Sequence, residues 1–536
     1  MWRNKSRYGL LDHTMRSSIL RAAQAGLGCT TRRRLPAPDL PRLPRLPRLP
    51  YLSSRGFSVT PARNNDEERK WSTPLAKQLT EAINTTGPIP LASYMRMCLT
   101  SDLGGYYTGA IEPGRDQFGQ KGDFITSPEI SQVFGELIGI WFVAEWMSQG
   151  RPKQGVELIE VGPGRGTLMD DILRTIRNFK DMASSIDAVY LVEASRELRK
   201  AQKNLLCGED AIMRESKEGW HSTCKYSDLP IVWTDSIRAI PQNASNMPFI
   251  VAHEFFDALP IHAFQVVDVP PTQQPTTSSG SPRSASSSTT SPTRQWREMV
   301  VSPTPEGTTH ADLGTPPAER HEPVPEFRLT LSPSQTRHAL YLPESSPRYR
   351  ALRSVPDALI EVCPDAWLYA TDFASRIGGT AARPKPRPSG AALILDYGPS
   401  DAVPVNSLRG IRRHRRVSPL SLPGLVDLSA DVDFLALVEA ATRASDGVEC
   451  HGPVDQADFL TAMGIRQRAE MLSRKVGGGG GGGQDGSDKA ADIEKAWRRL
   501  VDRGPGGMGK LYKALAILPE NGGKRRPVGF GGDVGA

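Results

Sequence analysis

The chain has 536 residues, which is enough for one large domain with insertions or for two to four domains. Its 66 Lys and Arg against 59 Asp and Glu give a formal net charge of +7. Residues 1–57 alone carry +10 and the remaining residues sum to −3, so a general nucleic-acid-binding surface is not supported. The six cysteines form no CxxC pair, and they predict neither a structural zinc site nor a disulfide framework.

Residues 1–57 resemble a mitochondrial targeting peptide, because they are rich in Arg, contain Ser, lack Glu and include the amphipathic run 15–27. A basic disordered arm is the alternative. The tetrapeptide Arg55-Gly56-Phe57-Ser58 resembles a matrix-protease pattern with Arg three residues before the cut. It predicts cleavage after Phe57 and residence in the mitochondrial matrix.

Residues 58–155 predict an N-terminal helical region. Two helices are expected at 75–83 and 91–99, because apolar residues recur there at helical spacing. A third is expected to start with Ser127 as N-cap and Pro128 at the first helical position.

The most apolar stretch of the chain is 130–147. It contains Glu136 and Glu145, and no segment reaches the roughly 18 uninterrupted apolar residues of a membrane span. The stretch therefore predicts an amphipathic helix and no membrane span.

Short apolar runs alternate with helical patterns from residue 156 onwards, and each run ends in a polar or glycine-rich turn. The expected strands are 157–161, 188–192, 231–233, 249–252 and 392–395. Their continuous hydrophobicity favours a parallel α/β sheet that is buried on both faces.

The predicted sheet domain spans 156–475. It carries an insertion at 270–294, rich in Ser, Thr and Pro, which predicts a disordered hairpin tip between strands at 264–267 and 296–301. A glycine-rich linker is expected at 476–490, followed by a helix, a late strand and a tail at 491–536.

The strongest chemical signal is the segment Leu158 to Thr167, LIEVGPGRGT, with a helical pattern after it. A strand, a glycine-rich turn and a helix N-terminus let a ligand approach the backbone and its exposed N–H groups. The spacing Glu-x-Gly-x-Gly-x-Gly differs from the dinucleotide fingerprint. With its Glu before the first glycine, it resembles the arrangement of S-adenosylmethionine-dependent methyltransferases, and this resemblance implies a loop that lies against the methionine part of the cofactor. The expected cofactor-binding residues here are Glu160, Gly162, Gly164, Gly166 and Thr167.

The next predicted strand ends at Glu193, about 30 residues after the first glycine, where a carboxylate can accept both ribose hydroxyls. A solvated acid at a strand end is the alternative. Asp235 follows the third strand and is expected near the adenine, or else is an ordinary turn residue.

A second glycine motif at 504–510 matches the spacing G-x-x-x-x-G-K of a phosphate loop. Leu511 replaces the Ser or Thr that would hold magnesium, and the preceding residues look helical. The segment predicts a turn that leads into a late strand at 511–518.

Seven motifs occur in order along the chain, at 122–132, 160–167, 191–195, 254–260, 396–398, 427–434 and 452–460. Together they resemble the MidA-type S-adenosylmethionine-dependent methyltransferases, which include a mitochondrial protein-arginine methyltransferase that assists assembly of respiratory complex I. The similarity spans roughly 75–517, excluding the low-complexity insertions.

The resemblance implies the doubly wound, Rossmann-like sheet of class I methyltransferases and S-adenosylmethionine as cofactor. It also implies symmetric dimethylation of an arginine in the 49 kDa-type subunit of complex I, or in its assembly intermediate. It also suggests that Asp123, Ser127 and Glu129 close over the cofactor, although Ser127 is equally explained as a helix cap.

Glu254 and Asp257, after the fourth strand, are the catalytic candidates, because ligands bind outside the carboxyl ends of parallel strands. Carboxylates can orient an arginine through bidentate bonds and accept its proton during transfer. We expect Glu254 to grip the guanidinium and Asp257 to orient it or to cap the following turn. The alternative is that both only cap backbone amides. His253 is expected to point to the opposite face and to pack.

The basic run Arg409, Arg412, Arg413, Arg415 and Arg416 is read as a solvated face, with contact to an acidic partner as the alternative. Two other functions remain open. One is a cofactor-binding assembly chaperone without turnover, and the other is a small-molecule methyltransferase. The sequence does not decide the oligomeric state.

Overall fold

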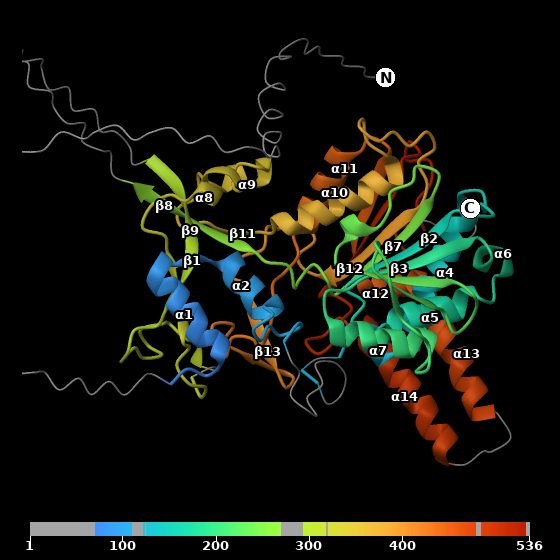
Figure 1. Ribbon diagram of the computed structural model, residues 1–536, viewed down its shortest axis with the longest axis horizontal. Coiled ribbons are helices and arrows are strands. Elements are labelled where there is room, and N and C mark those ends of the chain that lie inside the picture. Colours follow the sequence, from blue (N-terminus) through green and yellow to red (C-terminus); the bar gives the residue numbers. More distant parts are fainter. Residues whose placement is uncertain are drawn as a thin grey trace, which may run out of the picture. The chain divides into compact units, whose positions relative to one another are not determined.

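The largest sheet of the described residues has nine strands, several of which are labelled in Figure 1. The computed structural model describes residues 70–109, 122–123, 125–269, 293–317, 320–478 and 484–531. The predicted targeting peptide lies outside these residues. So does the predicted insertion at 270–294, except for its last two residues, which begin a strand.

The order of the nine strands is β16-β17-β12-β7-β2-β3-β6-β5-β4. Their bounds are β2 (Val156–Val161), β3 (Ile186–Val192), β4 (Arg214–Glu215), β5 (Trp220–Thr223), β6 (Pro230–Thr234), β7 (Met247–His253), β12 (Ala391–Tyr397), β16 (Val448–Asp455) and β17 (Tyr512–Pro519). The five strands predicted from the sequence are the central ones, β6-β3-β2-β7-β12, and all of them run parallel. The prediction of a parallel sheet is therefore confirmed for these strands.

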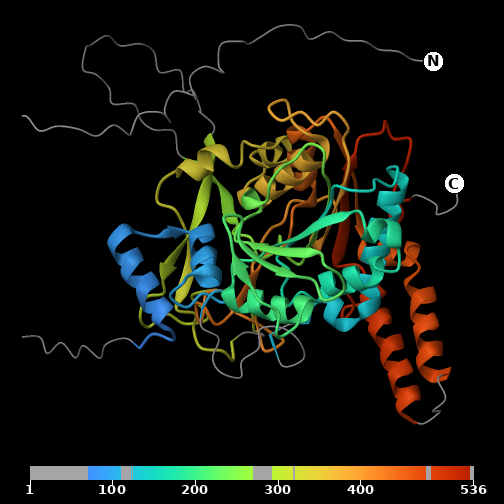
Figure 2. The same ribbon diagram turned by 45° about the vertical axis from the view of Figure 1, so that its right-hand side comes forward.

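Helices cover both faces of this sheet, as Figure 2 also shows. In β2, Leu158 packs into one hydrophobic core and its neighbour Ile159 into the other, so alternate side chains serve opposite faces. The helices of the first face are α4 (Gln132–Ser148), α5 (Thr167–Ile176), α7 (Arg196–Cys207), α12 (Gln456–Ala462), α13 (Ile465–Gly478) and α14 (Gln484–Val501). Those of the second face are α10 (Pro364–Gly378) and α11 (Phe434–Ala444).

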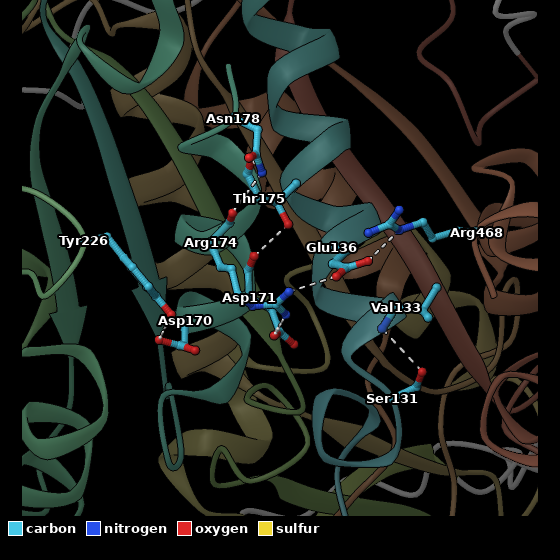
Figure 3. A network of polar contacts seen from close by, with 10 residues as sticks. All are labelled: Ser131, Val133, Glu136, Asp170, Asp171, Arg174, Thr175, Asn178, Tyr226 and Arg468. Atoms are coloured by element: carbon cyan, nitrogen blue, oxygen red, sulfur yellow. Dashed lines mark hydrogen bonds and ion pairs between the residues drawn. The ribbon is translucent and has the colours of Figure 1, made fainter. Parts of the chain in front are cut away.

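Helix α4 is buried around most of its circumference, which corrects the expectation of an amphipathic helix. Its Glu136 is 3% exposed and accepts from Arg174 of α5 at 2.9 Å and from Arg468 of α13 at 2.7 Å (Figure 3). Glu145 is likewise buried and pairs with Arg525. A charge that cannot stay in water is tolerable in the interior when a partner compensates it. Glu136 and Glu145, which suggested a polar face, therefore form ion pairs that link α4 to neighbouring segments.

A second sheet has the path β1-β9-β8-β11, and β10 also pairs with β9. Its strands are β1 (Ile89–Pro90), β8 (His262–Val269), β9 (Thr293–Pro303), β10 (Phe327–Leu331) and β11 (Leu359–Val362). The predicted hairpin is confirmed, because Val266 of β8 pairs antiparallel with Trp296 of β9. Helices α1 (Pro74–Thr86) and α2 (Leu91–Thr100) confirm the two predicted N-terminal helices, and they share a core with this sheet.

The remaining elements are short. The helices are α3 (Ser127–Ile130), α6 (Lys180–Ala183), α8 (Arg337–Tyr341) and α9 (Pro347–Leu352), and a 3-10 turn covers Ile237–Ala239. A three-stranded sheet contains β13 (Arg409–Arg412), β14 (Arg415–Val417) and β15 (Asp427–Ser429).

Helix α13 ends at Gly478 and α14 begins at Gln484, so helices reach into both ends of the range predicted as a linker. The second glycine motif forms a turn in which the N–H of Gly507 donates to the carbonyl of Gly504. Strand β17 follows this turn, which confirms the late strand. No helix in the described part of the chain is both long and apolar enough to cross a membrane.

Candidate functional site

The glycine turn joins β2 to α5 in a left-handed backbone. Gly162, Gly164 and Gly166 have φ angles of 65°, 54° and 86°, a region that side chains rarely adopt. A Cβ on Gly162 would lie 2.5 Å from Cδ2 of Phe255, so no larger residue fits there without displacing that ring. Helix α5 begins at Thr167 directly after Gly166. The turn therefore presents bare backbone and a helix N-terminus at the end of the strand.

A cavity of about 280 Å³ lies against this turn, and its wall includes side chains from four of the parallel strand ends. Of the predicted cofactor residues, the cavity wall contains Glu160, Gly162, Gly164, Thr167, Glu193 and Asp235. Gly166 lies behind the wall as the N-cap of α5. The structure thus brings residues from sequence positions 160 to 235 around one space.

Glu193 is held by its own strand end and by the following helix. Its Oε1 accepts from the backbone N–H of Ser195 at 2.8 Å, and its Oε2 accepts from Nε2 of Gln202 at 3.1 Å. Burial raises the pKa of Glu193 to about 7, although these hydrogen bonds oppose the shift. The expected alternative of a solvated acid at the strand end is wrong, because the residue is buried.

Gln202 was not identified from the sequence. It is completely buried on α7, and its Nε2 also donates to the carbonyl oxygen of Gly164 at 2.7 Å. Its Oε1 accepts from the indole of Trp233 at 2.9 Å. One side chain therefore joins the glycine turn to Glu193, and no short motif marks it in the sequence.

Asp235 lies on the cavity wall, but its side chain is 76% exposed and pairs with Arg199 at 2.5 Å. This exposure places it at the mouth of the cavity.

Glu160 lies deep in the same wall. Burial raises its pKa to about 8, and the nearby negative charge of Glu193 adds to the shift. Its Oε2 has no hydrogen-bond partner among the described residues. A buried oxygen without a partner is costly for a folded protein, so this atom indicates a place for a donor from a ligand.

Glu254 follows the end of β7 and also lines the cavity. Its backbone has a φ of 49°, and its Oε1 has no partner in the described residues. Burial raises its pKa to about 8, and the charge of Asp257 contributes to the shift.

His253 was expected on the opposite face, and this expectation is wrong. Its Nε2 lies 3.4 Å from Oε1 of Glu254, and both residues line the cavity. The left-handed backbone at Glu254 interrupts the alternation of a regular strand, so neighbouring side chains reach the same space. The ring of His253 also packs against Phe134 at a centroid distance of 5.0 Å, as the packing interpretation required.

Asp257 is buried but does not line the cavity. Burial raises its pKa to about 6, while the charge of Arg409 opposes the shift. Hydrogen bonds from the backbone N–H groups of Ala258 and of Asp257 itself also lower its pKa, which agrees with the expected cap of the following turn. The preceding turn is held by Asp396, whose Oδ2 accepts from the backbone N–H groups of Phe255 at 3.1 Å and Phe256 at 2.8 Å. Asp257 therefore acts on Glu254 from outside the cavity wall, through its charge, and Asp396 is a further structural residue that sequence reasoning named only as part of a motif.

The arginines of the basic run lie in different environments. Arg409 pairs with Asp431 at 2.6 Å and lies over the ring of Tyr397, so it is not part of a solvated face. Arg413, Arg415 and Arg416 are exposed, as the interpretation of the run as a solvated face predicted.

The motif before α4 is arranged differently from its prediction. The N-cap of α3 is Thr126, with Glu129 completing a capping box, and Ser127 is the first helical residue. Glu129 lines the cavity and pairs with Arg165 at 3.7 Å. Asp123 is away from the cavity wall and accepts from the hydroxyl of Tyr106 at 2.8 Å.

The site as a whole fits a ligand that carries both hydrogen-bond donors and apolar parts. Its wall offers the unpaired atoms Glu160 Oε2, His253 Nε2 and Glu254 Oε1. A side chain at position 162 would collide with the ring of Phe255, which also lines the cavity. Such a cavity at the carboxyl ends of parallel strands is the usual position of a ligand site in an α/β sheet.

Comparison with known proteins agrees with this geometry. A family model described as "Putative S-adenosyl-L-methionine-dependent methyltransferase" matches residues 137–454. The chain is 35% identical over 459 residues to "Protein arginine methyltransferase NDUFAF7, mitochondrial" of Rattus norvegicus, covering 85% of this chain and 87% of that protein. The Homo sapiens protein of the same name is 35% identical over 450 residues, with 83% of this chain and 84% of that protein covered.

A solved structure shares the fold. It is a "likely methyl transferase" from Burkholderia thailandensis bound to S-adenosyl-homocysteine, with a TM-score of 0.57 and 21% identity, covering 86% of this chain and 94% of that chain. The family resemblance predicted from the motifs is confirmed. The chain therefore belongs to this family of S-adenosyl-L-methionine-dependent methyltransferases and is a relative of the NDUFAF7 proteins.

Proposed function

We propose that this chain transfers methyl groups from S-adenosylmethionine to an arginine side chain of a protein. In its specific form, the proposal is symmetric dimethylation of the 49 kDa-type subunit of complex I, or of its assembly intermediate, in the mitochondrial matrix. The names of the relatives support the arginine and the mitochondrion, and the Arg-rich residues 1–57 support import.

The observation that carries the proposal is the carboxylate of Glu254. It is buried at the cavity wall, and its Oε1 has no hydrogen-bond partner among the described residues. A guanidinium offers several N–H donors in a planar fork, and a carboxylate is the acceptor that matches this fork. A substrate arginine would therefore supply the missing donors.

Seven residues are proposed to hold the cofactor: Glu160, Gly162, Gly164, Gly166, Thr167, Glu193 and Asp235. The glycine turn would receive the methionine part, with Glu160 beside its ammonium group. Glu193 would accept the ribose hydroxyls, and Asp235 would lie on the adenine side at the cavity mouth. When bound, the cofactor supplies an electrophilic methyl group on a sulfonium.

Glu254 is proposed as the residue that grips the substrate guanidinium and accepts its proton as transfer proceeds. Its raised pKa of about 8 suits a group that must take up a proton near neutral pH. Asp257 is proposed as a positioning residue, since it is buried outside the cavity wall and acts on Glu254 through its charge. Much of the rate would come from alignment, for which about 7–11 kcal/mol is available in well-oriented reactions.

The same proposal assigns the central sheet to the doubly wound class I methyltransferase arrangement. The order β6-β3-β2-β7-β12 with parallel strands supports it, as does the antiparallel β17 between β12 and β16. The domain division into 1–57, 58–155, 156–475, 476–490 and 491–536 also remains a proposal.

The test is to incubate the protein with labelled S-adenosylmethionine and mitochondrial matrix extract, and then to locate the label by mass spectrometry. Label on an arginine of a complex I subunit is expected, and the dimethyl-arginine fragment ions distinguish a symmetric from an asymmetric product. Cofactor binding without label transfer would instead favour an assembly chaperone. A labelled metabolite would favour a small-molecule methyltransferase.

A further inference from the structure

Two histidines and a glutamate meet on the second sheet, outside the cavity wall described above. They are His262 at the start of β8, Glu298 in β9 and His338 in α8. Their ligand atoms all lie within 4.8 Å of one another. Nδ1 of His262 is 2.7 Å from Oε1 of Glu298, and Nδ1 of His338 is 3.2 Å from the same oxygen.

The carboxylate at the centre of this cluster is fully buried, with a side-chain exposure of 0%. Its two oxygens contact the rings of His262 and His338 and the hydroxyl of Thr336. In the described part of the chain, both of its ion pairs are with histidines, and neither is with Lys or Arg. No permanently charged side chain of the described residues pairs with this carboxylate, so a bound cation at this position would compensate a buried negative charge.

We propose that His262, Glu298 and His338 bind one divalent transition-metal ion, with zinc as the ion that best fits the donor set. Two imidazole nitrogens and one carboxylate oxygen are a common zinc ligand set, and they leave a fourth position for water. His338 is 47% exposed, so the cluster opens to solvent on the side where that water would bind.

Two of the three separations between ligand atoms are close to those that zinc needs, and the third is at most 4.8 Å. Ligand atoms about 2.1 Å from a tetrahedral ion lie about 3.4 Å apart. The contact of His338 is already near this separation, and that of His262 would lengthen by about 0.7 Å. The other carboxylate oxygen, Oε2, accepts from the hydroxyl of Thr336 at 2.5 Å, a contact that orients the carboxylate from outside the ligand set.

An ion at this position would join three elements that are far apart in the chain. Glu298 is 36 residues after His262, and His338 is 40 residues after Glu298. No closely spaced ligand motif exists at such separations, which explains why the sequence predicted no metal site. The ion would fasten α8 to the β8–β9 hairpin, and β8 begins five residues after Asp257.

The test is zinc chloride titration of the full chain by calorimetry, after treatment with a chelator and dialysis. We expect one saturable zinc site per chain and a zinc-dependent rise in melting temperature. His338→Ala should lower the zinc affinity at least about 10-fold and remove the rise in melting temperature. Because His338 is half-exposed, this variant is expected to fold, and circular dichroism checks that it does.

His321→Ala is the matched control. His321 is 64% exposed and lies 3.4 Å from Glu322, so it also pairs with a glutamate, but it is not part of the cluster. This variant should bind zinc with unchanged affinity. Absence of a saturable zinc site in the wild type would overturn the proposal, and so would zinc binding that persists unchanged in His338→Ala. In those cases the cluster is a hydrogen-bonded network without an ion.

Discussion

His253 Nε2 and Glu254 Oε1 face each other at 3.4 Å, and neither atom has another hydrogen-bond partner in the described residues. Burial lowers the pKa of His253 to about 3 and raises the pKa of Glu254 to about 8. At pH 7 both side chains are therefore mostly uncharged, and they do not form an ion pair. A cation that enters the cavity would favour ionised Glu254, which is the state that the proposed transfer to arginine requires.

The first prediction concerns the pH dependence of methyl transfer. Ionised Glu254 is the proposed active form, so kcat/KM should rise with pH through about 8. The charge of Asp257 raises the pKa of Glu254, so Asp257→Asn should move this rise to lower pH. Measurement of kcat/KM for the wild type and for Asp257→Asn between about pH 6.5 and 9.5 checks the direction of this change. Asp181→Asn, on an exposed position of α6, should leave the midpoint in place. A midpoint that moves upward in Asp257→Asn would contradict the assignment.

The second prediction concerns proton release when S-adenosylhomocysteine binds. The pKa of Glu160 is raised to about 8, so this carboxyl is mostly protonated at pH 7 in the free protein. If it ionises beside the ammonium group of the ligand, binding should release up to one proton. Calorimetry in buffers of different ionisation enthalpy measures this number. Glu160→Gln should remove the release and weaken binding, whereas equal proton release in both proteins would argue against Glu160 as a ligand residue.

The raised pKa values of Glu160 and Glu254 also predict how the free energy of unfolding depends on pH. In the folded state the pKa values of Glu160 and Glu254 are about 8, above the ordinary value of 4.5. The folded state therefore holds protons that the unfolded state releases, so stability should fall as pH rises from about 4.5 to 8. Urea unfolding at pH 6 and pH 8 checks the direction for the ligand-free protein. Glu160→Gln should make the dependence shallower, and a stability that rises over this range would be inconsistent with both shifts.

A glycine substitution tests whether the glycine turn contacts the ligand. Gly162→Ala would place a Cβ 2.5 Å from the ring of Phe255, so we expect at least a tenfold loss of affinity for S-adenosylhomocysteine. Gly208→Ala is the control, because Gly208 also has a positive φ, of 100°, but faces open space. Both variants carry backbone strain of about 1 kcal/mol or more. Calorimetric titration should show weakened binding only for Gly162→Ala, and equal affinities would show that the turn does not contact the ligand.

A further substitution tests the role of Gln202, which joins Glu193 to the glycine turn. Gln202→Ala should destabilise the protein by about 1–3 kcal/mol, because it leaves buried partners unsatisfied. It should also weaken S-adenosylhomocysteine binding about tenfold. Gln456 is equally buried and donates to the carbonyl of Leu500 at 3.0 Å, away from the cavity wall. Gln456→Ala should therefore lower stability without lowering affinity. Loss of affinity in both variants would mean that the effect is only on folding.

The central strands and the glycine turn could be predicted from the sequence for a physical reason. Strands buried on both faces are continuous apolar runs, and the carboxyl ends of parallel strands meet at one edge of the sheet. Glu160 and Glu193 could therefore be expected together from the sequence alone, and the cavity wall contains both.

Residues whose role depends on tertiary contacts could not be predicted in this way. Gln202 occupies an ordinary position in α7, and only the packing of that helix brings it to Gly164. His253 was assigned to the wrong face because the rule of strand alternation does not hold next to the left-handed backbone of Glu254. Glu136 looked like part of a polar face, and its arginine partners come from α5 and from α13, which is distant in sequence.

The most direct test of the proposed function compares the wild type with Glu254→Gln in two assays. One assay measures S-adenosylhomocysteine affinity by calorimetry, and the other measures methyl transfer to the 49 kDa-type subunit by mass spectrometry. We expect the variant to bind the ligand with an affinity close to that of the wild type and to lose transfer by at least about 100-fold. Methyl transfer by Glu254→Gln at the wild-type rate would contradict the assignment.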